Sequence, residues 1–118
     1  MKVYVYYNLH KKLWSIKALE GDRKGLVIAH RKHVVLTKVT PKVSQKGRER
    51  VLREKKKNVH AGLVGEWNDK KLILGLYNAD EITYNPYKYN SFVFKEDDSK
   101  FEYARAAWLG DKRVWVIQ

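Results

Sequence analysis

The chain has 118 residues, enough for one ordinary domain and too few for two, so we expect a single domain spanning residues 1–118. Hydrophobic residues make up 44% of the sequence and can supply a core, and the absence of cysteine excludes disulfides, thiol catalysis and cysteine-based zinc sites. The formal net charge of +12 favours acidic partners, and no apolar stretch is long enough to predict a signal peptide or a membrane span.

The positive charge is concentrated in the first half of the chain. Residues 1–60 contain 17 lysines and arginines against 4 acidic residues, whereas residues 61–118 contain 8 against 9. Such asymmetry is expected when one face of a protein meets a polyanion. The alternative is a generally basic surface without a specific partner, because charge asymmetry by itself is not recognition.

The first part of the chain predicts strands. Residues 2–7 are rich in valine and tyrosine, and residues 13–18 alternate apolar and polar side chains, so together they predict an opening hairpin. Two further strands are predicted over residues 26–29 and 34–39. Pro41 cannot donate a backbone hydrogen bond, and we expect it to end this part of the sheet.

Residues 44–57 have a different pattern, which predicts a helix. Ser44 is a suitable N-cap, and Glu49 precedes Arg53 by four residues, the spacing of neighbours on a helix surface. Apolar residues are few in this segment. We therefore expect a surface helix with most of its circumference in water.

The second half of the chain returns to strands. Alternation over residues 59–67 and the apolar content of residues 72–77 predict two of them, and the dipeptide Asn85-Pro86 predicts a turn. Three more strands, joined by hairpin turns, are predicted at residues 92–95, 101–109 and 113–117. The expected fold class is α+β: a mainly antiparallel sheet, able to adopt a barrel-like shape, with one inserted surface helix near residues 44–57.

The candidate site with the strongest signal is the basic segment over residues 46–57. Arginine offers a planar fork that matches phosphate, lysine offers a flexible charge, and both release counterions when they bind a nucleic-acid backbone. The alternative is a solvated helix face held by its own ion pairs. The candidate phosphate-binding residues of this region are Lys46, Arg48, Arg50, Arg53, Lys56, Lys57 and Asn58.

His60 follows this segment and is the candidate catalytic residue. Nearby cations disfavour its protonation, which leaves a neutral imidazole able to accept a proton in phosphodiester cleavage. The alternative is a structural histidine bonded to the backbone, so whether the protein is an enzyme stays open. No metal site is expected, because His30 and His33 are not aligned by a helix, and no motif for a cofactor is present.

Three tyrosines surround the predicted turn at Asn85-Pro86. Exposed aromatic side chains beside cations form platforms on which unpaired bases stack. Tyrosine is also an ordinary strand residue, so the alternative is that some of the three belong to the core. The candidate stacking residues are Tyr84, Tyr87 and Tyr89.

Three stretches of the sequence carry a resemblance: YVYYNLHK at residues 4–11, GRERVLREKKKNVHA at residues 47–61 and ITYNPYKYNSFV at residues 82–93. They are similar to a group of short proteins, without an assigned activity, that are encoded by tailed bacteriophages. The resemblance implies a phage protein made in the cytoplasm of an infected bacterium, and it supplies no catalytic residues. Small phage proteins of this kind often act on host defence or on nucleic-acid metabolism.

These observations leave three functions open. The first is binding of a phosphate-bearing polyanion, RNA or DNA above all, and it is the one that we expect. The second is a small nuclease with His60 as the base. The third is an anti-defence inhibitor that sequesters a nucleotide signal, in a pocket shared by two subunits, or that docks on an acidic host protein. All three need no cofactor and no membrane.

Overall fold

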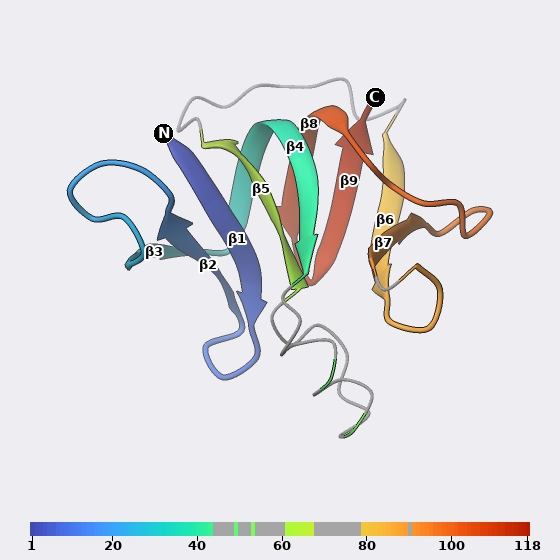
Figure 1. The fold of residues 1–118 in the computed structure, drawn as a ribbon, viewed down its shortest axis with the longest axis horizontal. Coiled ribbons are helices and arrows are strands. Elements are labelled where there is room, and N and C mark those ends of the chain that lie inside the picture. Colours follow the sequence, from blue (N-terminus) through green and yellow to red (C-terminus); the bar gives the residue numbers. More distant parts are fainter. Residues whose placement is uncertain (44–48, 50–52, 54–60, 68–78, 90) are drawn as a thin grey trace.

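The computed structural model of the chain describes residues 1–43, 49, 53, 61–67, 79–89 and 91–118. Nine strands run through these residues and belong to one antiparallel sheet with the order β3-β2-β1-β5-β4-β8-β9-β6-β7 (Figure 1). The strands are β1 (Lys2–Asn8), β2 (Leu13–Ala18), β3 (Val27–Arg31), β4 (His33–Val43), β5 (Ala61–Trp67), β6 (Asp80–Asn85), β7 (Ser91–Phe94), β8 (Ala104–Gly110) and β9 (Arg113–Ile117).

The opening hairpin, β1 with β2, is confirmed. Val3 and Val5 of β1 are fully buried, and the residues between and after them point to the other face, as the period of a strand requires. Asn8 closes the turn, because its Oδ1 accepts hydrogen bonds from the backbone N–H groups of His10 (3.0 Å) and Lys11 (3.1 Å). The local sequence therefore fixes both the strands and their connection.

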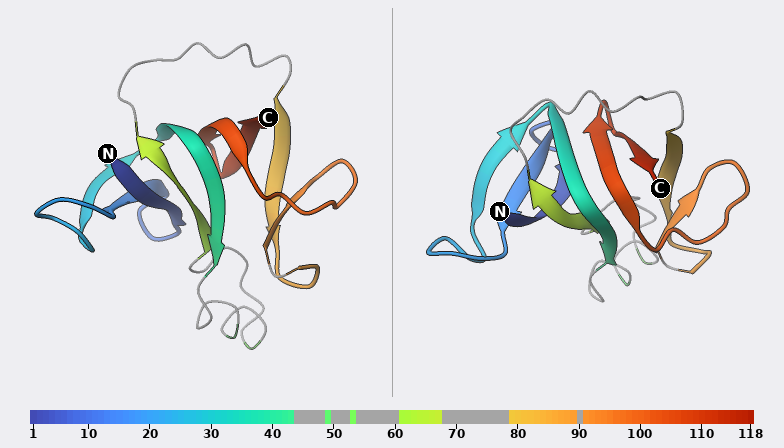
Figure 2. Two further views of the ribbon diagram at one scale, coloured as in Figure 1. Left: turned by 45° about the horizontal axis from the view of Figure 1, so that its top comes forward. Right: turned by 90° about the horizontal axis from the view of Figure 1, so that it is seen from above.

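Strand β4 is the element that curls the sheet. Lys38 has a left-handed backbone (φ 54°), and the register of pairing shifts between Thr37 and Thr40. The pairing of β4 with β8 runs from His33 to Val39, and its pairing with β5 runs from Leu36 to Val43. Figure 1 shows β4 as an arch. Figure 2 shows the result, a sheet that curves from β1–β3 round to β6 and β7.

Pro41 does not end this part of the sheet, contrary to the sequence-based expectation. Strand β4 continues to Val43, and Pro41 pairs with Leu63 of β5. The pairing of β4 with β8 stops at Val39, so the later part of β4 has a ladder on one side only. A proline is tolerated there, because its missing N–H is not needed on the side without a partner.

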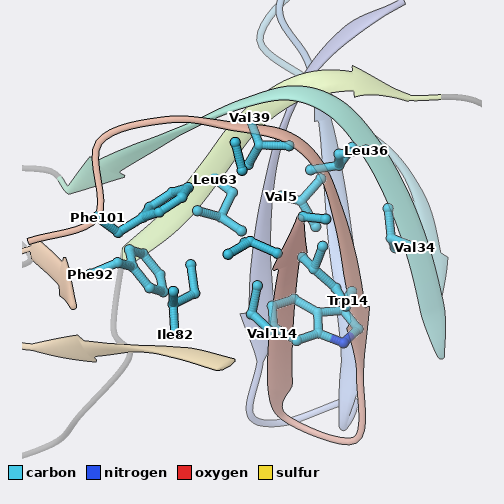
Figure 3. Close-up of a cluster of buried hydrophobic side chains, with 14 of the residues drawn as sticks. Val5, Trp14, Val34, Leu36, Val39, Leu63, Ile82, Phe92, Phe101 and Val114 are labelled. Carbon is cyan, nitrogen blue, oxygen red and sulfur yellow. The ribbon is translucent and has the colours of Figure 1, made fainter. Parts of the chain in front are cut away.

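The core lies on the concave side of the curled sheet (Figure 3). Val5, Leu36 and Leu63 come from three different strands, and each is no more than 1% exposed. Phe101 lies between β7 and β8 and is fully buried, and its backbone N–H donates a hydrogen bond of 2.9 Å to the carbonyl oxygen of Phe92. The connection after β7 thus supplies a side chain that the strands alone do not.

The expected α+β class is wrong. Residues 1–43, 61–67, 79–89 and 91–118 contain no helix, and strands make up nearly all of their regular structure. The physical reason is the bend in β4, since a sheet that folds over its own apolar face needs no helix to cover it. The helix predicted near residues 44–57 lies outside the described residues except for Glu49 and Arg53, and so does the strand predicted at residues 72–77.

Candidate nucleic-acid interface

Four chain connections lie along one end of the curled sheet, the lower end in Figure 1, spread from the β1–β2 side to the β6–β7 side. They are the β1–β2, β6–β7 and β8–β9 turns and the connection from β4 to β5, whose terminal residues Val43 and Ala61 pair with each other. Lys112 of the β8–β9 turn lies over the ring of Tyr7 in β1, with 5.7 Å between Nζ and the ring centroid. We call this region the basic end and define it by its described cations, Lys11, Lys12, Lys42, Lys88 and Lys112.

Among the residues that the structure describes, none of the ion pairs joins a cation of the basic end to a carboxylate. The ion pairs between described residues join the N-terminal amino group to Glu66, and Lys95 and Arg113 to Glu81. Among the described residues of the turns at this end, Asp111 is the single acid. Glu20 and the acidic residues 96–98 lie in the connections β2–β3 and β7–β8 instead. The described turns of the basic end therefore carry a net positive charge.

Arg113 stands next to the β8–β9 turn but does not contribute free charge. Its Nε and Nη2 atoms each donate a hydrogen bond of 2.9 Å to the Glu81 carboxylate, to which Lys95 Nζ also donates at 3.2 Å. The bonds from Arg113, followed by those from Lys95, hold the pKa of Glu81 below its usual value. This carboxylate is charged at neutral pH and neutralises Arg113, which is why Arg113 is not counted in the basic end.

The three candidate stacking tyrosines are placed differently. Tyr87 and Tyr89 lie in the β6–β7 turn with 71% and 55% of their surface exposed, and Lys88 Nζ lies 5.9 Å from the centroid of the Tyr89 ring. Asn85 holds this turn by accepting hydrogen bonds from the backbone of Tyr87 (2.9 Å) and Lys88 (3.1 Å). Tyr84 is 2% exposed and packs against Phe92 in the core. The exposed pair remains the candidate for stacking.

Two further tyrosines lie side by side on the outer face of β1. The ring centroids of Tyr4 and Tyr6 are 5.8 Å apart, and Lys42 Nζ lies 5.9 Å from the centroid of the Tyr4 ring. Burial, with the nearby Tyr6 as the second cause, raises the pKa of Tyr4 to about 12. The Tyr4 phenol therefore stays neutral, and its ring face is the part that Lys42 contacts.

A small pocket opens between the strands of the basic end. Its volume is about 30 Å³, and it contains Trp14, a buried residue whose ring makes an edge contact with Tyr7 (5.2 Å between centroids, 78° between planes). The pocket is lined by Tyr7, Trp14, Ala61, Ile82, Thr83, Tyr84, Phe92, Lys112 and Val114. Because these residues come from six strands and one turn, the pocket exists only in the folded sheet.

Most of the basic segment predicted from sequence cannot be placed. Arg53 is described and exposed, whereas Lys46, Arg48, Arg50, Lys56, Lys57, Asn58 and His60 lie outside the described residues. The roles predicted for these residues stay predictions. The structure adds where the segment is attached, because the chain leaves the sheet at Val43 and returns at Ala61, both at the basic end.

The sequence analysis did not single out the lysines in the turns. Lys11 and Lys12 follow the turn-forming Asn8, and Lys112 stands in a two-residue turn after Gly110. The sequence therefore indicates each turn, but it does not indicate that these turns lie at the same end of the sheet. Two of the four histidines make other contacts: His30 Nδ1 lies 3.0 Å from Ser15 Oγ, and His33 stacks on Trp108 at 5.2 Å between ring centroids. The described residues contain no group of three or more metal-ligating side chains.

Fold and surface together define a small, basic protein whose described part is an antiparallel sheet with several lysines in the turns at one end. The model of one family, described as Mycobacterium phage L5 gene 82 protein, matches residues 1–117 of the chain. A protein of this family, the Gene 82 protein of Mycobacterium phage L5, is 40% identical over 120 residues, covering 97% of this chain and 94% of its own length. The chain therefore belongs to this family of phage proteins, which confirms the resemblance found in the sequence.

No solved structure matches the chain. In the part of the chain that the structure describes, no helix has the length and apolar character that crossing a membrane requires.

Proposed function

We propose that this phage protein binds nucleic acid through its basic end. The observation that supports the proposal is that Lys11, Lys12 and Lys112 lie in turns at one end of the sheet, where no ion pair joins any of them to a carboxylate among the described residues. Lysines that neutralise phosphates release condensed counterions, and this release is the main source of affinity in binding that does not depend on base sequence. The segment 44–60, which is attached to the same end, adds seven lysines and arginines against two acids.

Single-stranded nucleic acid is the form that the surface fits best. Tyr87 and Tyr89 expose their rings on either side of Lys88, so aromatic faces and a cation alternate in one turn. Stacking of an unpaired base on an aromatic ring is worth about 1–3 kcal/mol. In a duplex the base faces are covered by their neighbours, and these rings have nothing to stack on.

The test compares two variants that lose the same charge at different places. Lys11→Gln/Lys12→Gln/Lys112→Gln removes three cations of the basic end, and Arg23→Gln/Lys24→Gln/Lys100→Gln removes three exposed cations in other connections. Affinity for a fluorescent 20-nucleotide strand is measured by anisotropy at several salt concentrations. We expect the first variant to bind more weakly and to reduce the slope of log K against log salt by about 2, at roughly 0.7 for each lost phosphate contact.

Equal losses in the two variants would show that net charge, and not the basic end, governs binding. Wild-type protein that does not bind the strand at low salt would contradict the proposal outright. In that case thermal-shift measurements with cyclic dinucleotides test the nucleotide-signal alternative, because a bound ligand stabilises the folded state by mass action. Intact labelled strand after incubation with both wild type and His60→Ala would remove the nuclease alternative.

A further inference from the structure

Two tyrosine rings form a strip on the outer face of the sheet. Val3 and Val5 of β1 are buried in the core, so Tyr4 and Tyr6, which alternate with them, project from the opposite face. The centroids of these two rings are 5.8 Å apart and the ring planes differ by 31°, so the rings are direct neighbours. We call the two rings the tyrosine strip.

Gly62 of β5 lets the strip extend toward β4. Strand register places Gly62 opposite Tyr6 on one side and opposite Lys42 on the other, and the three strands lie side by side in Figure 1. The Tyr4 ring occupies the space above this glycine, since a Cβ atom at residue 62 would lie 2.8 Å from Tyr4 Cζ. The Tyr4 ring therefore reaches over β5 toward Lys42, whose Nζ lies 5.9 Å from the ring centroid.

The two rows of side chains that contain the strip carry cations and, among the described residues, no carboxylate. Residues directly opposite each other in neighbouring strands share a face of the sheet. One row is His30, Ser15, Tyr6, Gly62 and Lys42, and the next is Lys17, Tyr4, Val64 and Thr40. The acid of β5, Glu66, lies two residues beyond Val64 and is paired with the N-terminal amino group.

Tyr6 is the ring of the strip that is available to a ligand. The residue is only partly buried, and its partners in the two neighbouring strands, Ser15 and Gly62, have a short side chain and none. The Tyr4 ring, in contrast, is packed against Gly62 and lies beside Lys42. Because Lys42 also belongs to the basic end, the strip adjoins that region directly.

We propose that a single strand bound at the basic end continues onto this face, where one unpaired base stacks on Tyr6 and a neighbouring phosphate contacts Lys42. The inference rests on the proposed function and deepens it, because it adds a binding position on the face of the sheet to those in the turns. Stacking on an aromatic ring tolerates every base, so this position adds affinity without selecting a sequence. Tyr4 is a positioning residue, which holds its ring between Tyr6 and Lys42.

The experiment measures the affinity of Tyr6→Leu for the fluorescent 20-nucleotide strand by anisotropy at several salt concentrations. Leucine keeps apolar bulk but removes the ring, so affinity should fall at least about fivefold, the lower end of the range for one stacked base. The slope of log K against log salt should stay at the wild-type value, because stacking releases no counterions. Tyr6→Phe, which keeps the ring, should bind like wild type.

The matched control is Tyr103→Leu, which removes a 54% exposed tyrosine from the β7–β8 connection and should leave affinity unchanged. A strand made of abasic nucleotides gives a second comparison, and wild type and Tyr6→Leu should bind it equally. If Tyr6→Leu does not fold, wild type is crosslinked by light to a strand that carries 5-iodouracil. Mass spectrometry should then find the crosslink at Tyr6, within the tryptic peptide of residues 3–11.

Three results would overturn the inference and leave the proposed function standing. They are an unchanged affinity of Tyr6→Leu, an equal loss of affinity on the abasic strand, and crosslinks confined to the turn of Tyr87 and Tyr89. Wild-type protein that binds no strand overturns the proposed function instead, so the two failures are distinguishable.

Discussion

The side chains at the basic end differ in what surrounds them, and that difference follows from strand register. Ile82 and Tyr84 lie two residues apart on the buried face of β6, whereas Tyr87 and Tyr89 fall beyond its end and are exposed. The sequence could name the three tyrosines as candidates but not separate them, because the end of β6 depends on its pairing with β7. Trp14 was likewise recognisable as a strand residue, while the pocket that it lines depends on five other strands and a turn.

Glu81 provides a test at the same scale. Its pKa is lowered by Arg113 and Lys95, so its contribution to stability is present above the ordinary pKa of a glutamate and is lost as the pH falls through the lower, folded-state value. Glu81→Gln should therefore lower the free energy of unfolding by about 0.5–1 kcal/mol at pH 7, the range of exposed ion pairs. Urea denaturation at pH 7 and at pH 3 measures the free energy of unfolding of the wild type and of Glu81→Gln.

At pH 3 the difference in free energy of unfolding between wild type and Glu81→Gln should shrink, because a larger fraction of Glu81 is then protonated and neutral, as Gln is at every pH. Asp98→Asn, which changes an exposed acid in the β7–β8 connection, serves as the control and should have little effect at either pH. If Glu81→Gln lowers the free energy of unfolding by the same amount at both pH values, the ion pairs of Glu81 with Arg113 and Lys95 do not stabilise the fold as predicted.

Among the elements, β4 decides the shape of the protein, and it was the hardest to predict. The valine-rich run at residues 34–39 correctly indicated a strand, but nothing in its period marks Lys38 as the bend. A proline ordinarily interrupts a ladder and so predicts the end of a strand, but Pro41 lies where β4 is paired on one side only, and there the strand continues. Local pattern therefore predicted most strands, while the curl that replaces a covering helix depends on how distant strands pair.

The bend at Lys38 can be tested by substitution. A left-handed backbone costs little for glycine and more for a β-branched residue, so Lys38→Gly should leave stability unchanged or raise it by about 0.5–1 kcal/mol. Lys38→Val should lower the free energy of unfolding by about 1–2 kcal/mol. The midpoint of urea unfolding gives both values, and Lys17→Val in β2, where the backbone is extended, is the control. Equal effects of Lys38→Gly and Lys38→Val would contradict a strained bend.

For the proposed binding of nucleic acid by the whole molecule, the distribution of the charged side chains over the fold matters more than the net charge. Sequence analysis correctly found more positive charge in the first half of the chain, but that description mixes cations at different ends of the fold. Arg23 and Lys24 belong to the basic half yet lie in the β2–β3 connection, whereas Lys88 and Lys112 come from the neutral half and lie at the basic end. Lys88 and Lys112 lie at the same end as Lys11 and Lys12 only because of the order of the strands in the sheet.

The most direct test of the proposed interface maps where a strand binds. Backbone amide signals of the ¹⁵N-labelled wild-type protein are followed while an unlabelled oligonucleotide is added at low salt. Binding at the basic end predicts that the largest changes occur in the turns at residues 9–12, 86–89 and 111–112, with little change at residues 20–25 and 95–100. Changes concentrated in the latter two connections, or spread evenly over the surface, would contradict the account.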